Sequence, residues 1–204
     1  MRAYGDRALL VELGDAGRVV AWVDALRESA PPGVAEVVPA AETVLVVAED
    51  RADLERLRSA LRQVAPGPVR WETGTGDAVE IPVRYDGPDL PDVARLTGLT
   101  EAEVVRAHTG ATWRVAFGGF APGFGYLVGD DDRLHVPRRE TSRTRVPAGA
   151  VALAGAYTGV YPRESPGGWQ LIGTTDAPMW DLDRDPPALL TPGAIVRFVA
   201  AEDS

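Results

Sequence analysis

Glycine and proline are distributed unevenly along this 204-residue chain, and their placement limits the folds that the chain can adopt. Of 39 such residues, 12 lie in residues 1–78 and 27 lie in residues 79–204. Glycine and proline interrupt regular elements and mark turns. We therefore expect two domains, 1–78 and 79–204, with the boundary near residues 74–78. The second domain should be built from short strands joined by frequent turns.

Apolar residues in the first domain alternate between strand and helix spacing. The pattern predicts strands at 8–13, 34–39, 43–48 and 69–71, with helices over 19–29 and 54–64. Asp50 is the expected cap of the second helix. The order β-α-β-β-α-β predicts a small two-layer sandwich of ferredoxin-like type. Such a fold alone does not define a function.

The second domain begins with a strand at 79–85 and two short helices. One helix covers 90–96, and the other starts at a capping box formed by Thr100 and Glu103 and runs to about His108. Only strand-length segments follow, at 113–117, 125–127, 145–146, 151–154, 169–173 and 195–199. This pattern predicts a closed or nearly closed β-barrel, and the whole chain is of the α+β class.

Missing residue types exclude several kinds of chemistry. The chain has no cysteine, and all 21 of its basic residues are arginine. Disulfides, cysteine metal sites, thiolate nucleophiles, a phosphate-loop lysine and a Schiff base are therefore excluded. His108 and His135 are the two histidines, which is too few for a three-histidine zinc site. We expect both to be structural, with His108 favoured as a cation at a helix end, and we expect no metal site in this chain.

The net charge and the apolar segments indicate the expected partners and cellular location. A net charge of −9 disfavours nucleic acid as a partner. Residues 1–6 lack the apolar core of a signal peptide. The longest uncharged run, 146–162, is broken by glycine and proline and is too short for a typical membrane span. We therefore expect a soluble cytoplasmic protein with no membrane partner.

Two segments could carry chemistry. Residues 117–127 hold four glycines and four aromatic residues, which suits a pocket where backbone N–H groups approach an anion between aromatic walls. A tight barrel corner with core aromatics is the alternative. Residues 138–145 hold four arginines, which suit carboxylate or phosphate binding because guanidinium offers two parallel donors. A solvated loop paired with neighbouring acids is the alternative here. Spacing alone indicates that 155–162 and 165–169 are turns joining barrel strands.

Taken in order, the motifs resemble the carboxyltransferase-domain, allophanate hydrolase subunit 1 family. The motifs that carry the resemblance are 81–83, 86–90, 119–127, 137–147, 158–162, 165–173 and 192–193. The family includes the B subunit of bacterial ATP-dependent 5-oxoprolinases and the sporulation kinase A inhibitor. The resemblance covers the second domain strongly and the first in element order only. It implies a small α/β domain followed by a cyclophilin-like β-barrel.

The resemblance also implies a function. The chain would be the B subunit of a 5-oxoprolinase complex, working with the sister C and A subunits. That complex would open 5-oxo-L-proline to L-glutamate with hydrolysis of ATP, together with Mg²⁺. Tyr157 and Ser142 depart from the residues usual in the family, which leaves the substrate open. Two alternatives remain: a regulatory protein that inhibits a histidine kinase, and a component of a biotin-dependent urea or allophanate system.

The same motifs supply the expected substrate- or nucleotide-binding residues: Phe120, Pro122, Gly123, Phe124, Tyr126, Arg138, Arg139, Arg143, Thr158, Tyr161, Gly167, Gly168 and Trp169. A pocket on the second domain should be lined by the five aromatic residues among them and by Arg138 and Arg139. The chain offers no identifiable general base, so we expect it to be inactive alone. Replacing Arg139 with alanine should lower turnover of the complex without unfolding the barrel, since a surface arginine contributes little stability.

Overall fold

The computed structural model describes residues 1–49, 53–71 and 78–201, which form two compact units, Met1–Arg70 and Trp71–Ser204. The boundary expected at residues 74–78 lies almost entirely outside the described residues, and so does Asp50. Within the described part, the second helix is capped by Asp53, whose carboxylate accepts from the backbone N–H groups of Glu55 and Arg56.

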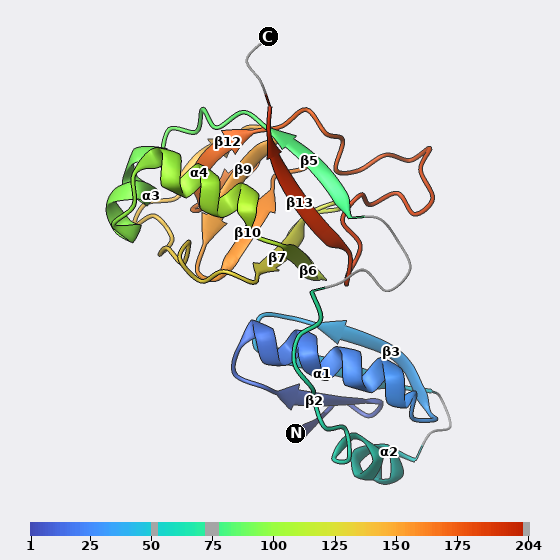
Figure 1. The fold of residues 1–204 in the computed structure, drawn as a ribbon. Coiled ribbons are helices and arrows are strands. Elements are labelled where there is room, and N and C mark those ends of the chain that lie inside the picture. Colours follow the sequence, from blue (N-terminus) through green and yellow to red (C-terminus); the bar gives the residue numbers. More distant parts are fainter. Residues whose placement is uncertain (50–52, 72–77, 202–204) are drawn as a thin grey trace. The chain divides into compact units, whose positions relative to one another are not determined.

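The first unit is a four-stranded antiparallel sheet with two helices on one face (Figure 1). The strands occur in the order β1-β2-β4-β3. The element bounds are β1 (Arg2–Tyr4), β2 (Ala8–Glu12), α1 (Ala16–Ser29), β3 (Val34–Pro39), β4 (Thr43–Ala48) and α2 (Leu54–Leu61). Alternate residues such as Leu9 and Val46 pack against Trp22 of α1 and Leu57 of α2. This arrangement confirms the two-layer sandwich.

One strand of this sheet differs from the expected one. Residues 69–71 form no strand. In a ferredoxin-like unit the last strand pairs with the first at the sheet edge, and β1 occupies that edge here. A turn at Gly5, whose φ is +68°, lets β1 fold back onto β2. All three β1 residues are exposed, so the segment lacks the apolar alternation that marks a strand in sequence.

The second unit is a seven-stranded sheet that curls into a nearly closed barrel, with strand order β12-β9-β10-β7-β6-β13-β5 (Figure 1). The predicted barrel is thus confirmed. Its strands are β5 (Val79–Val83), β6 (Trp113–Gly118), β7 (Gly125–Gly129), β9 (Ala150–Ala154), β10 (Tyr157–Val160), β12 (Gln170–Thr174) and β13 (Ile195–Ala200). A two-stranded sheet is added by β8 (Arg143–Val146) and β11 (Ser165–Gly167).

The barrel closes where the chain beyond β5 meets β12. Arg84 and Thr174 exchange two backbone hydrogen bonds of 2.8 Å, and Gly87 N–H donates to the Ile172 carbonyl at 3.3 Å. A side chain at Gly87 would lie 2.3 Å from the Ile172 backbone, and one at Gly173 would lie 2.4 Å from the Arg84 oxygen. Glycine is therefore required on both sides of this seam.

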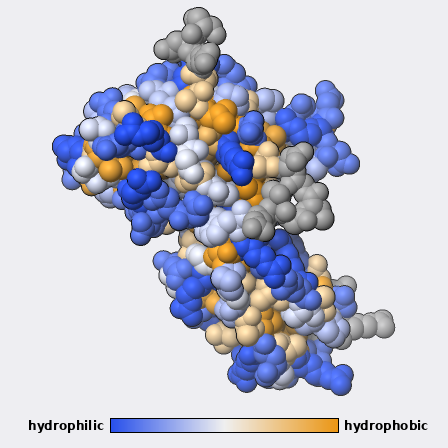
Figure 2. Space-filling model, in the orientation of Figure 1, coloured by the Kyte–Doolittle hydropathy of each residue, from blue (hydrophilic) through white to orange (hydrophobic). Residues whose placement is uncertain are grey.

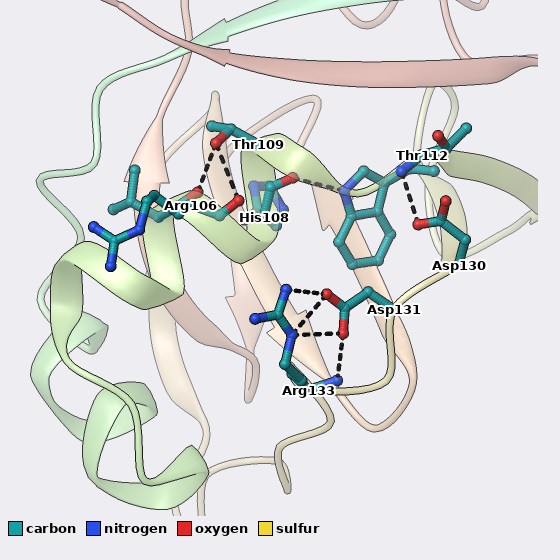
Figure 3. Close-up of polar contacts among 9 residues, drawn as sticks. Arg106, His108, Thr109, Thr112, Asp130, Asp131 and Arg133 are labelled. Atoms are coloured by element: carbon teal, nitrogen blue, oxygen red, sulfur yellow. Dashed lines mark hydrogen bonds and ion pairs between the residues drawn. The ribbon is translucent and has the colours of Figure 1, made fainter.

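Two helices cover the barrel core: α3 (Leu90–Thr97) and α4 (Glu101–Gly110). The predicted capping box of α4 is present, and its hydrogen bonds from Thr100 lower the pKa of Glu103. At the other end of α4, the Trp113 indole N–H donates to the His108 carbonyl, and Thr112 N–H donates to Asp130, both at 2.9 Å (Figure 3).

His108 lies fully buried in this core, and burial lowers its pKa to about 3. The expectation of a histidine cation at the helix end is therefore wrong. The ring is neutral, and its nitrogens contact the Tyr85 hydroxyl at 2.7 Å and the Thr158 hydroxyl at 2.9 Å. The Thr158 hydroxyl donates onward to the Ala152 carbonyl at 3.1 Å. Thr158 therefore accepts from Nε2–H, and Tyr85 donates to Nδ1.

Two segments expected to be turns contain strands, β10 and β11. Glycine within each segment interrupts the alternation of apolar residues, so the sequence pattern did not predict these strands. Elsewhere on the surface, hydrophobic residues lie in small patches among hydrophilic ones on the visible face (Figure 2). Among the described residues, none of the helices is long and apolar enough to cross a membrane.

Candidate functional site

The strand β9 separates two different environments in the barrel unit. Its odd-numbered residues Val151 and Leu153 belong to the large core beneath α3 and α4. Its even-numbered residues Ala150, Ala152 and Ala154 face a second cluster of buried residues. Successive side chains on a strand point to opposite faces, so one strand serves both. The three alanines leave room above β9 for large rings.

Aromatic rings fill that room. The aromatic cluster consists of Phe117, Phe120, Phe124, Tyr126, Tyr157, Tyr161 and Trp169. Phe124 is its centre, with ring centroids 5.0–5.5 Å from those of Phe120, Tyr126, Tyr161 and Trp169. Most of these contacts are edge-to-face, the arrangement that aromatic quadrupoles prefer. The structure thus brings together all five aromatic residues selected from the sequence, and adds Phe117 and Tyr157.

Glycines let the rings and the backbone approach each other closely. A side chain at Gly159 would lie 2.9 Å from the Gly125 oxygen and 3.1 Å from the Phe124 ring. A side chain at Gly167 would lie 2.2 Å from the Tyr161 hydroxyl, and one at Gly168 would lie 2.7 Å from the Ser142 hydroxyl. These glycines therefore act by their small size at the edge of the cluster.

The turn before β7 holds Phe120 at the rim of the cluster. Phe120 is 56% exposed and has φ of +64°, a conformation that costs a bulky residue energy. Gly123, beside Pro122, also has a positive φ and packs against the backbone of Met179. The N–H groups of Ala121 and Phe124 donate to carbonyls of the turn itself, so they do not form an anion cradle.

The clustered arginines have different partners. Arg139 and Arg143 donate to the same carboxylate oxygen of Asp89, at 2.6 and 2.7 Å. Asp89 is 2% exposed, and its other oxygen accepts from the backbone N–H of Leu171 at 2.7 Å. Arg145 pairs with Glu164 at the surface. Arg139 and Arg143 therefore hold residues 138–145, the arginine segment, against β12 through an internal carboxylate, and the Arg139 side chain is partly buried, with 31% of it exposed.

Arg138 differs from these three. Among the hydrogen bonds and ion pairs of the described residues, none involves Arg138, and its side chain is exposed. Its charge acts on two hydroxyls of the aromatic cluster. Burial raises the pKa of Tyr126 and of Tyr161, and the Arg138 guanidinium partly opposes both shifts. Arg138 is therefore a positive charge without an ion pair among the described residues whose field reaches the two tyrosines.

A cavity of about 420 Å³ is lined by α3, the arginine segment and β12. We call it the α3 pocket. It is lined by Asp92, Arg95 and Leu96 of α3, by Pro137, Arg138, Arg139, Glu140 and Thr141, and by Gln170 of β12. Arg138 belongs both to this lining and to the surroundings of the tyrosines.

Thr158 was selected from the sequence but lies away from the aromatic cluster, and Asp89 was not selected although it binds two arginines. The Thr158 hydroxyl points into the barrel core toward His108, away from the aromatic cluster. Asp89 was missed because its partner Leu171 lies 82 residues further along the chain. Its position before α3 is also typical of a simple helix cap, although its side chain makes no capping bond. Among the described residues, no group of three potential ligands gathers as a metal site.

The comparisons with known proteins place this chain, with its barrel, aromatic cluster and arginine segment, among carboxyltransferase domains. Residues 1–190 match the family described as carboxyltransferase domain, subdomain C and D. The chain is 39% identical to the 5-oxoprolinase B subunit of Escherichia coli O157:H7, over 98% of this chain and 94% of the relative. It is 38% identical to the 5-oxoprolinase B subunit of Haemophilus influenzae, over 87% and 84% respectively. The chain belongs to the carboxyltransferase-domain family.

Solved structures agree with this assignment. The crystal structure of TTHA0988 superposes with a TM-score of 0.75 at 39% identity, and covers 98% of this chain. This chain spans only 40% of the TTHA0988 chain. Similarity to urea amidolyase of Saccharomyces cerevisiae is weaker, at 25% identity over 99% of this chain and 13% of the relative.

Proposed function

We propose that this chain is the B subunit of an ATP-dependent 5-oxoprolinase that opens 5-oxo-L-proline to L-glutamate and works with the A and C subunits of that enzyme. The observation that carries the proposal is the near full-length similarity to two proteins named as 5-oxoprolinase B subunits. The barrel unit supports it, because its arginine segment contains a cation, Arg138, that has no ion pair among the described residues.

Opening the lactam ring develops negative charge, which explains why the reaction needs a cation. Opening a lactam is unfavourable unless the amide oxygen is activated, for instance by transfer of the terminal phosphoryl group of ATP. Water then attacks the carbonyl carbon, the C–N bond breaks and the nitrogen takes a proton, which leaves an acyl phosphate on the former ring carbonyl. A second water hydrolyses this acyl phosphate to the carboxylate and inorganic phosphate. Positive groups placed at the developing phosphate charge lower the barrier of such a step. Arg138 can supply one such charge, whereas Arg139 and Arg143 are already neutralised in part by Asp89.

Proton transfer needs a group that the described part of this site does not supply. His108 is fully buried in the barrel core and bonded to Tyr85 and Thr158, so it cannot reach a ligand bound at the surface. Arginine stays protonated near neutral pH and cannot readily act as a base. We therefore assign the general base to a partner chain of the complex, and we expect the isolated chain to be inactive.

The experiment is reconstitution with the candidate A and C subunits and measurement of ADP release in the presence of Mg²⁺. ADP release that depends on 5-oxo-L-proline and on all three chains supports the proposal. The same turnover by the isolated chain would refute the division of labour. Release that requires urea and biotin, without response to 5-oxo-L-proline, would favour the weaker relationship to urea amidolyase.

A further inference from the structure

The α3 pocket contains a buried side chain with an unused hydrogen-bonding atom. Gln170 is 5% exposed, and its Nε2 donates to the Pro137 carbonyl at 3.2 Å. Its Oε1 is buried and has no partner. Exchanging the two amide atoms would set Oε1 against the Pro137 oxygen, which is also an acceptor, so the orientation is determined. Gln170 therefore combines a place in the pocket lining with a buried acceptor that has no partner.

The arginines around the same pocket are hydrogen-bond donors, so they require an acceptor as a partner. Arg95 is paired with Asp92 at 3.0 Å, and Arg139 is paired with Asp89. The Nε of Arg139 is nevertheless buried without a hydrogen-bond partner, and Arg138 has no ion pair among the described residues. A planar carboxylate fits guanidinium donors of this kind. Glu140 and Asp92 limit the net positive charge of the lining, which favours a ligand with a single negative charge.

We infer that the α3 pocket binds a small carboxylate that also carries an N–H donor: the carboxylate faces Arg95, Arg138 and Arg139, and the N–H group donates to Oε1 of Gln170. A cavity of about 420 Å³ accommodates a molecule of this size. The inference rests on the proposed function for its probes, since 5-oxo-L-proline and L-glutamate, as substrate and product, both combine a carboxylate with N–H donors.

The test is calorimetric titration of the purified full chain with three ring compounds. They are 5-oxo-L-proline, cyclopentanecarboxylate, which lacks the N–H group and the lactam carbonyl, and 2-pyrrolidinone, which lacks the carboxylate. We expect 5-oxo-L-proline to bind at least tenfold more tightly than either analogue. Titration with L-glutamate then shows whether the pocket prefers the substrate or the product.

Variants identify the groups responsible. Gln170→Leu keeps a similar side-chain volume and removes the acceptor, so it should abolish the preference for 5-oxo-L-proline over cyclopentanecarboxylate. Arg95→Ala should weaken both carboxylates severalfold, and because Arg95 is exposed this variant is expected to fold even if Gln170→Leu does not. Arg106→Ala, an exposed arginine of α4 outside the pocket, is the matched control and should bind normally.

Several results would overturn the inference: no binding by any probe, equal binding of 5-oxo-L-proline and cyclopentanecarboxylate, or an unchanged preference in Gln170→Leu. These outcomes are independent of turnover. A reconstituted complex that hydrolyses 5-oxo-L-proline with an unchanged KM in Gln170→Leu refutes the pocket and leaves the proposed function standing. A complex without that activity, whose chain still discriminates between the ring compounds, refutes the proposed function alone.

Discussion

The two faces of β9 show how one strand can support both a sealed core and a site. Beneath the helices, Val151 and Leu153 pack in a core that also contains Trp113 and Phe198, and His108 lies fully buried there between Tyr85 and Thr158. On the other face, Ala152 and its alanine neighbours support aromatic rings that extend to an exposed rim at Phe120. Large strand residues fill their own space, whereas small ones leave space that residues from distant segments can occupy.

The strongest way to break this arrangement is to remove the carboxylate that ties the arginine segment to β12. Asp89→Ala leaves Arg139 and Arg143 without their shared partner and the Leu171 N–H without an acceptor. We expect a loss of about 3–5 kcal/mol in the free energy of unfolding, because unpaired buried charges are costly. Urea denaturation measures it. Glu164→Ala, which breaks an exposed pair with Arg145, should cost less than about 1 kcal/mol.

Acid should destabilise the enclosed face through His108. Its pKa is lowered to about 3 in the folded protein, against about 6.5 in the unfolded chain. Above pH 6.5 both states are neutral and the residue has no effect on pH dependence. Between pH 6.5 and pH 3 only the unfolded chain binds the proton, so stability falls by about 1.4 kcal/mol per pH unit.

Unfolding by urea at a series of pH values measures this slope. The matched variant His108→Gln lacks the titrating group, and its stability should fall less steeply with acid over the same range. Parallel slopes for the two proteins would show that His108 is not buried in its neutral form.

Filling the space above the small residues should disturb the other face. A methyl group at Gly159 would meet the Gly125 backbone and the Phe124 and Trp169 rings at 2.9–3.2 Å. Gly159→Ala should therefore cost about 1–3 kcal/mol and change the near-ultraviolet circular dichroism of the aromatic residues. Gly110→Ala, at the end of α4, has open space around it and should leave both signals unchanged. A Gly159→Ala protein with wild-type stability and spectrum would contradict the close packing.

The sequence predicted features that depend on neighbouring residues. The capping box of α4 and the barrel strands with alternating apolar residues follow from local pattern, whereas the five motif aromatics were selected through the family resemblance. The three alanines of β9 could not be recognised as the surface on which the aromatic rings pack, because that role depends on which distant segments cover the strand. Asp89 has the same difficulty, since its partners lie 50–82 residues away. The strands β1 and β10 lack a clear alternation, so they were missed or assigned as turns.

The division of the arginines into structural and available ones is the central claim, and turnover of the reconstituted complex tests it most directly. Arg138→Ala should lower 5-oxo-L-proline-dependent ADP release by about 10²-fold or more, since it removes a donor at developing charge. Its unfolding free energy should change by less than about 1 kcal/mol, because Arg138 is exposed and forms no ion pair among the described residues. Arg145→Ala should be normal in both respects. Wild-type turnover in Arg138→Ala, or an equal loss in Arg145→Ala, would contradict the account.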